Sequence, residues 1–426
     1  MISSPPAPSS VATTSIPTTQ IRRFANGLTL VGEPMPSKQA AAFTFLIPAG
    51  SASEPAGRDG LSSVLESVCY RGAGDKDARQ LSDALDDLGV DRGGGADVEY
   101  TTFGGATLGL YLSEALALYA DILLRPTLPE DQWQPARDLA LQSLESLDDS
   151  PARKMFVQLR REYFTSGHGR SPIGTREGLS AISLQDLRAD HQNRFKPEGA
   201  ILALAGNFDF EAIAAQMETL FQNWQGAAPA IEAPRPVEIP VFQHIEQETA
   251  QQQIGVAYAG VPSTDVDFYA YRVATSILSG GMGARLFTEV REKRGLVYSV
   301  SASATSHRNI GFSLAYAGTT PARAQETLDV LLAELVKIGD GVSESELERA
   351  KIGMLSSLVM QEESSRARAG GIARDMWMLG RVRSLDEVTG AISAVSSSQI
   401  REFYERQPVK DFSVVTLGPA KLEKPQ

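Results

Sequence analysis

The order of structural patterns repeats once along this chain, and that repeat most restricts its possible folds. An extended apolar run at 41–50 precedes a helical pattern at 60–70, just as a run at 252–261 precedes a helical pattern at 269–278. Each half continues with an extended segment and two long helical patterns, at 101–112, 112–124 and 129–146 and then at 312–319, 321–338 and 343–361. A repeat of about 200 residues is too long for a solenoid unit, so it predicts two homologous α/β domains.

The two halves also end alike. A helical segment with a Ser at its start precedes a buried strand that ends in Gly, at 182–195 before 200–206 and at 395–407 before 411–418. Ser is a preferred N-cap residue, and alternating apolar residues are typical of half-buried antiparallel strands. We therefore expect an α/β (α+β) fold in which each domain has a mostly antiparallel sheet with helices on one face.

Composition shifts set the domain boundaries. A Pro- and Ala-rich stretch at 225–240 predicts a linker between domains at 21–224 and 241–426. Residues 1–20 are rich in Ser, Thr and Pro without an apolar core, which predicts a disordered leader. Such a leader suits either a cytoplasmic terminus or the tether of an exported protein, and we prefer the second, a periplasmic location.

Charge and cysteine content exclude several classes of protein. The net charge of -12 argues against a nucleic-acid surface, which needs clustered Lys and Arg. One cysteine, Cys69, permits neither an intramolecular disulfide framework nor a Cys-based zinc site. No apolar run approaches the roughly 20 residues of a membrane-spanning helix.

The helical segment GLSSVLESVCYRG at 60–72 resembles the G-L-x-H-x-x-E-H helix of the inverzincins, the family of pitrilysin, insulin-degrading enzyme and the mitochondrial processing peptidases. Two His one turn apart bind zinc in that family, and the Glu between them acts as general base. Ser63 and Ser67 occupy the His positions here, and Glu66 keeps the position of the base. Glu66 is then either a solvated surface residue or a remnant polar contact that lines the chamber.

A second segment, LSGGMGARLFTEVREKRGLVYSVSA at 278–302, closely resembles the signature of the family's C-terminal half. The resemblance, which spans about residues 21 to 420, implies that the two domains form half of a clamshell chamber. Arg291 and Tyr298 fall on the Arg/Tyr pair that faces zinc across the chamber in active members. Residue types alone would instead suggest that Arg291 pairs with Glu289 or Glu292 and that Tyr298 belongs to the core.

The chain lacks a zinc-ligand set of its own. A Ser hydroxyl is a poor zinc ligand, and Gln142 or Ser143 occupies the position of the family's third ligand, a Glu. Glu145 replaces them only if the register is shifted. The four His are isolated in sequence, at 168, 191, 244 and 307; we expect His168 to make structural hydrogen bonds and His191 and His307 to lie at the surface. We expect no cofactor in this chain and zinc in a partner.

Two further segments are candidates for substrate contact. The loop at 278–283 contains Gly280 and Gly281, which permit close backbone approach, and the resemblance assigns it a lesser guiding role. Active relatives have an extended edge at the position of residues 89–105 that pairs with the substrate backbone. Three consecutive glycines, 93–95, equally suggest a simple loop there.

The resemblance therefore implies a zinc-free subunit of a heteromeric metallopeptidase. Arg291 and Tyr298 would bind substrate and stabilise the transition state in trans, for a homologous partner with an intact H-x-x-E-H motif that hydrolyses unfolded peptides or oligopeptides. The alternatives are a non-enzymatic scaffold within a larger complex and a subunit that only binds peptides. Retention of the Arg/Tyr signature favours the first interpretation.

Overall fold

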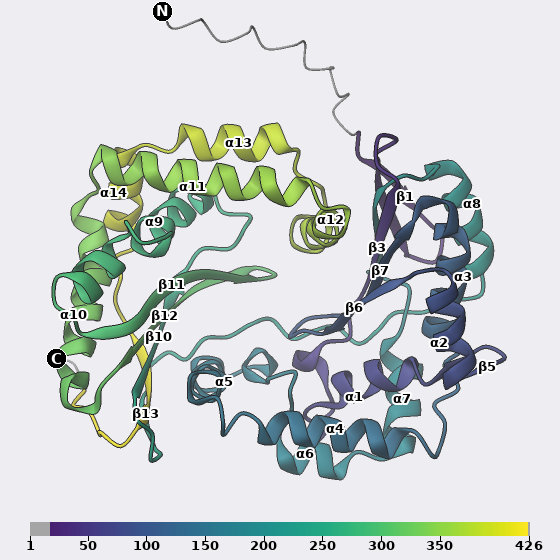
Figure 1. The fold of residues 1–426 in the computed structure, drawn as a ribbon, viewed down its shortest axis with the longest axis horizontal. Helices are drawn as coiled ribbons and strands as arrows, with labels where there is room; N and C mark the ends of the chain where they lie inside the picture. Colours follow the sequence, from purple (N-terminus) through teal and green to yellow (C-terminus); the bar gives the residue numbers. More distant parts are fainter. Residues whose placement is uncertain (1–17, 425–426) are drawn as a thin grey trace, which may run out of the picture.

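The computed structural model describes residues 18–424, which form two halves that each contain a large sheet (Figure 1). The leader predicted at 1–20 lies almost wholly outside the described residues. The first half holds a six-stranded sheet in the order β1 (Gln20–Arg23), β2 (Thr29–Pro34), β8 (Ile201–Gly206), β3 (Ala40–Ile47), β7 (Thr101–Leu108) and β6 (Asp91–Ala96). The second half holds a five-stranded sheet in the order β11 (Val297–His307), β12 (Ile310–Thr319), β10 (Gln252–Gly260), β13 (Ser413–Gly418) and β9 (Phe242–Glu246).

Most strand pairs in both sheets are antiparallel, as the alternating residue pattern predicts. Among the described strands, β2 with β8 and β9 with β13 are the parallel pairs. A minor two-stranded sheet joins β4 (Gly72–Ala73) to β5 (Lys76–Asp77). The two halves therefore share a mostly antiparallel architecture with one parallel pair in each large sheet.

Helices surround both sheets. The helices of the first half are α1 (Leu61–Cys69), α2 (Ala78–Asp87), α3 (Leu112–Leu124), α4 (Trp133–Glu145), α5 (Pro151–Tyr163), α6 (Arg176–Ala181), α7 (Leu184–Arg194) and α8 (Phe210–Phe221). Those of the second half are α9 (Phe268–Ser279), α10 (Ala324–Val336), α11 (Glu344–Glu362), α12 (Ser365–Leu379), α13 (Leu385–Ala394) and α14 (Ser397–Arg406). Most of the helices and strands predicted from the repeat are present at nearly their expected positions.

Helix starts follow the capping residues that the sequence indicates. Ser183, Ser343 and Ser396 each cap a helix through a reciprocal capping box. The helix expected from residue 129 begins instead at Trp133, because Leu128 has a φ of 43° and the chain makes a turn before the helix. Pro129 is thus part of the turn.

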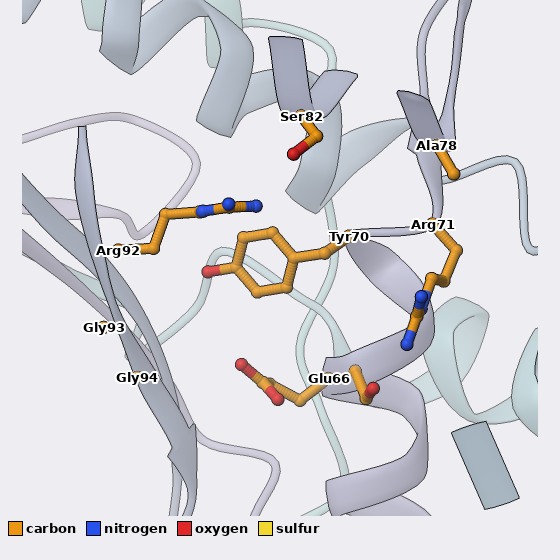
Figure 2. A pocket seen from close by; sticks show the side chains of 9 residues that line it. Glu66, Tyr70, Arg71, Ala78, Ser82, Arg92, Gly93 and Gly94 are labelled. Atoms are coloured by element: carbon orange, nitrogen blue, oxygen red, sulfur yellow. The ribbon is translucent and has the colours of Figure 1, made fainter. Parts of the chain in front are cut away.

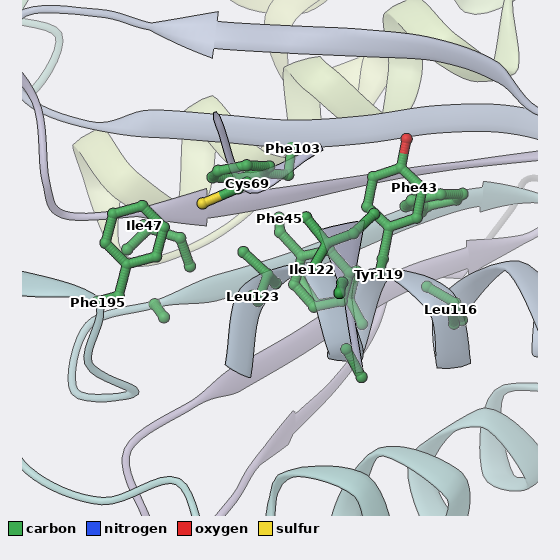
Figure 3. Close-up of a cluster of buried hydrophobic side chains, with 14 of the residues drawn as sticks. Phe43, Phe45, Ile47, Cys69, Phe103, Leu116, Tyr119, Ile122, Leu123 and Phe195 are labelled. Carbon is green, nitrogen blue, oxygen red and sulfur yellow. The ribbon is translucent and has the colours of Figure 1, made fainter. Parts of the chain in front are cut away.

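Each sheet packs one face against the helices of its own half. In the first half, Phe43 meets Tyr119 edge-on at 4.6 Å between ring centroids, and the Tyr119 hydroxyl donates to the Gly104 carbonyl at 2.8 Å. Figure 3 shows these rings packed with Phe45, Phe103 and the buried Cys69. A matching apolar core lies between the second sheet and α9, α10 and α14.

The other face of each sheet is covered by a helix from the opposite half. Helix α12 packs apolar side chains, including Ile372 and Trp377, on the first sheet, while α5 packs Met155 and Leu159 on the second sheet. The prediction that helices cover only one face of each sheet is therefore incomplete, because α12 and α5 each cover the second face of the other half's sheet. Because each half completes the burial of the other, the two halves form one interdependent structure.

Buried polar contacts reinforce the junction between the halves. Arg368 of α12 forms an ion pair with Glu33 of β2. The Glu99 carboxylate accepts hydrogen bonds from Trp377 Nε1 at 2.9 Å and from the Arg308 backbone amide at 3.0 Å. Across residues 18–424, no helix has both the length and the apolar character required to span a membrane.

Candidate functional site

Helix α1 is held in place from its N-terminal end. Gly60 precedes it with a φ of 101°, a conformation that favours glycine, and the buried Glu54 carboxylate accepts from the Gly60 and Ser62 amides at 2.9 and 2.7 Å. Arg194, paired with Asp190 at 2.6 Å, also donates to the Ser62 hydroxyl. This support fixes the direction in which the half-buried side of α1, with Ser63, Glu66 and Ser67, faces.

The residues at the zinc-ligand positions of α1 do not fit a zinc ion. The Ser63 hydroxyl donates to the Pro172 carbonyl at 2.6 Å and so serves a structural hydrogen bond. Ser67 offers only another neutral hydroxyl, whereas zinc prefers imidazole, thiolate or carboxylate. Within residues 18–424, no three His, Cys, Asp or Glu side chains are grouped as a metal ion would require.

Glu66 lines a pocket of about 460 Å³ together with Ser67, Tyr70 and Arg92. Figure 2 shows Glu66 and Tyr70 reaching from α1 toward the strand that carries Gly93 and Gly94. The interpretation of Glu66 as an ordinary solvated residue is therefore wrong: the side chain is half-buried, and burial raises its pKa from 4.5 to about 7.

The candidates for the third ligand position lie on α4, which packs against α1. Gln142 and Ser143 are both exposed, and the Ser143 hydroxyl donates to the Leu139 carbonyl at 2.9 Å within its own helix. Glu145 is paired with Arg176 at 2.9 Å. None of these three supplies the missing metal-binding chemistry.

Two of the four His residues meet at the junction between the halves. His168 is fully buried, with Nε2 3.3 Å from the Glu99 carboxylate, which agrees with a structural role. The expectation that His307 lies at the surface is wrong, because its ring is buried 5.4 Å from that of His168 between centroids. Burial lowers the pKa of His307 to about 4. His191 is half-buried and bonds to the Leu123 carbonyl, whereas a surface position was expected.

Arg291 lies on η4 (Phe287–Glu292), a short π-helical segment. Such segments are rare and often occur at functional sites. The predicted alternative, an ion pair with Glu289 or Glu292, is absent among residues 18–424: Glu289 pairs with Lys293 at 2.6 Å and Arg294 at 3.2 Å. The exposed Arg291 guanidinium lies over the Phe287 ring at 4.9 Å, so its donors remain available to a ligand.

Tyr298 lies at an irregularity of the strand that follows. The pairing of β11 with β12 shifts between Val297 and Ser299, which leaves Tyr298 in a β-bulge. Bulges redirect a side chain out of the regular pleat. The Tyr298 side chain is 60% exposed, so the alternative that it belongs to the core is wrong.

The glycine-rich loop at 278–283 begins where α9 ends. A Cβ at Gly280 would lie 2.4 Å from the Ser276 hydroxyl oxygen, so this position requires glycine. Gly281 has a φ of 149° with open space around it, and the neighbouring Met282 is 78% exposed. The loop is thus an open surface element close to η4 in the chain.

The segment with three glycines forms a strand, which corrects the interpretation of a simple loop. It is β6, the edge strand of the first sheet, and it pairs with β7 throughout. Arg366 of α12 covers part of its free side, with donors to the carbonyl of Asp91 and an ion pair to the Asp91 carboxylate at 2.6 Å. The edge that the sequence indicated is therefore present but partly closed.

Comparisons with known proteins agree with this arrangement. Residues 30–175 match the family described as insulinase (peptidase family M16), and residues 181–354 match the domain described as the peptidase M16 inactive domain. The chain belongs to peptidase family M16. It is 25% identical to a Bacillus subtilis protein described as an uncharacterized zinc protease, over 94% of this chain and 98% of that one. A similar Streptomyces coelicolor protein is 27% identical over 93% and 88% of the two chains.

Solved structures show the same M16 fold. The peptidase M16 inactive domain from Pseudomonas fluorescens superposes with a TM-score of 0.84 at 25% identity, covering 96% of this chain and all of that one. A Helicobacter pylori protease gives a TM-score of 0.85 at 19% identity, covering 95% of this chain and all of that one. The two-domain clamshell-type fold expected from the resemblance is confirmed.

The sequence did not reveal two features of this M16 chain. The pocket around Glu66 depends on Arg92 of β6, whose proximity to α1 no local pattern indicates. Arg366 covers β6 from a position 275 residues away in sequence from Asp91, on a helix that was not predicted. Covariation between such distant positions is the signal that could have found these contacts.

Proposed function

We propose that this chain is the zinc-free subunit of a heteromeric metallopeptidase, to which it contributes Arg291 and Tyr298. The observation that carries the proposal is the availability of both side chains: neither has an ion pair or side-chain hydrogen bond among residues 18–424, although each lies on an irregular element. An arginine held without a carboxylate partner gains most from a ligand that accepts its hydrogen bonds.

The two groups suit the chemistry of peptide hydrolysis. Negative charge develops on the former carbonyl oxygen in the transition state, and a Tyr hydroxyl can donate to that oxygen. A guanidinium can hold a peptide backbone through paired donors. The bond-breaking chemistry would belong to a homologous zinc-binding partner with an H-x-x-E-H motif, because the Ser63 and Ser67 positions cannot hold the metal.

The test is to mix this chain with such a partner and follow the cleavage of an unstructured fluorogenic peptide. Arg291→Ala and Tyr298→Phe should each lower the kcat/KM of the mixture by about 10²- to 10³-fold, as expected when one oxyanion donor is lost. Lys293→Ala is the matched control. It removes an exposed cation next to the same π-helical segment, and the ion-pair partner of that cation is Glu289.

A non-enzymatic scaffold is the second candidate, and one observation favours it. Arg366 occupies part of the β6 edge, where strand addition by a peptide would otherwise take place. A scaffold predicts that Arg291→Ala and Tyr298→Phe leave kcat/KM unchanged while the two chains still associate. A periplasmic location is part of the first proposal, and fractionation of cells that produce the full chain tests it.

A further inference from the structure

A second cavity, of about 800 Å³, lies where the two halves meet. It is lined by α9, α11, α12, α13 and β11 of the second half and by residues 97, 99, 100 and 160 of the first. It is separate in residue content from the pocket at Glu66. Its lining is rich in arginine, and the pairing of those arginines decides what the cavity can bind.

Some charges in the lining are already matched. Arg383 pairs with Asp375 at 2.6 Å, and Arg368 pairs with Glu362 at 3.0 Å as well as with Glu33. The Glu99 carboxylate is satisfied by donors from the surrounding protein. These groups have little capacity to attract an additional ligand.

Three arginines in the lining form no ion pair among residues 18–424. Arg160 of α5, Arg272 of α9 and Arg374 of α12 line the cavity, and none of them has a carboxylate within 4.0 Å among residues 18–424. Arg272 and Arg374 are exposed on the concave surface, whereas Arg160 is half-buried and is attracted by the Asp97 carboxylate. An unpaired guanidinium in a partly desolvated position is stabilised by an incoming anion.

The arrangement also brings like charges together. Arg272 and Arg383 lie over the same Phe268 ring, at 5.8 and 5.9 Å from its centroid. Burial, with smaller repulsive contributions from Arg383 and Arg374, lowers the pKa of Arg272 below its ordinary value. A ligand that places one negative charge between Arg272 and Arg374 would relieve this repulsion.

We propose that Arg272 and Arg374 bind a carboxylate of a bound peptide, from an acidic side chain or the C-terminus. This inference rests on the proposed function, since it supplies a class of preferred peptide. A single planar carboxylate matches the forked donors of arginine. Asp97 and Glu99 in the same lining disfavour anions of higher charge, such as phosphate.

The experiment measures binding of two fluorescent peptides of equal length to the full chain. One has Glu residues and a free C-terminus, and the other has Gln at those positions and a C-terminal amide. The acidic peptide should bind more tightly, and the double change Arg272→Gln/Arg374→Gln should weaken it about 10- to 100-fold while the affinity for the neutral peptide stays the same.

Two controls complete the design. Arg401→Gln removes an exposed cation on α14 and should change neither affinity. An unchanged affinity for the neutral peptide shows that the double variant is folded. The inference is overturned if the double variant loses affinity equally for both peptides, or if the wild-type chain binds both peptides equally or binds neither. It is also overturned if inorganic phosphate competes with the acidic peptide more strongly than acetate does. Failure of the proposed function is detected separately, as an unchanged kcat/KM for peptide hydrolysis when the Arg291 or Tyr298 variant is mixed with the zinc-binding partner.

Discussion

The half-buried side of α1 and the segment from η4 into β11 are the two regions in which the resemblance predicts site residues, and they differ in how their polar groups are used. On α1 the Ser63 hydroxyl is bonded to Pro172, and Glu66 is half-buried with a raised pKa. On the second segment Arg291 has no carboxylate partner within the described residues, and Tyr298 is 60% exposed.

This difference indicates what each region now contributes. Hydrogen bonds at α1 stabilise the chain and the burial of Glu66 there destabilises its charged form, so substitutions at α1 should change the free energy of unfolding. Side chains that form no such contacts contribute little to folding, so substitutions at Arg291 and Tyr298 should be visible only when a substrate and a partner are present.

Arg194→Met should give the largest loss of stability. Arg194 is 3% exposed, pairs with Asp190 and donates to the Ser62 hydroxyl at the start of α1. Removal of one partner from a buried ion pair leaves the other charge uncompensated and costs about 3–5 kcal/mol. Urea denaturation measures the change, and the matched variant Arg291→Met should shift the free energy of unfolding by less than about 0.5 kcal/mol. Equal losses of unfolding free energy in Arg194→Met and Arg291→Met would contradict the difference between the two regions.

Glu66→Gln should stabilise the chain in a pH-dependent manner. Burial raises the pKa of Glu66 to about 7 from 4.5, so the folded chain binds more protons than the unfolded chain between these values. Wild-type stability attributable to Glu66 therefore falls as the pH rises from about 4.5 through about 7. The variant avoids this loss and should be more stable by about 1–3 kcal/mol at pH 8, with no difference near pH 4.

The comparison of the two proteins across pH isolates Glu66 from other titrating groups. Glu54 also has its pKa raised to about 7 by burial, but it is present in both proteins and cancels in the difference. Denaturation at pH 4, 6 and 8 gives the required values. A constant difference at all three pH values would show that the pKa of Glu66 is the same in the folded and the unfolded chain.

Ser63→Ala should have the smallest measurable effect. Its hydroxyl donates at 2.6 Å to Pro172, and loss of one such hydrogen bond costs about 1 kcal/mol. Tyr298→Phe, which removes an exposed hydroxyl, should leave stability within about 0.5 kcal/mol of wild type. Thermal unfolding of both variants measures this difference, and a larger loss at Tyr298 than at Ser63 would contradict it.

Local patterns predicted the elements and many of their capping residues well, because helix starts such as Ser343 depend on neighbours within a turn. The assignment of Arg291 and Tyr298 rests on a contiguous signature and stays a prediction. Local patterns did not predict the exchange of α5 and α12, the burial of His307 or the pocket at Glu66. Those features depend on contacts between residues far apart in sequence, for which a single chain offers no pattern.

A titration of the zinc-binding partner with this chain separates assembly of the two chains from catalysis by Arg291 and Tyr298. Peptide hydrolysis should rise with added wild-type chain until the partner is saturated. The double variant Arg291→Ala/Tyr298→Phe should saturate the partner at the same concentration of added chain, with kcat/KM at the plateau at least about 10²-fold lower. Equal plateaus for the two chains would contradict a role for Arg291 and Tyr298 in the shared site.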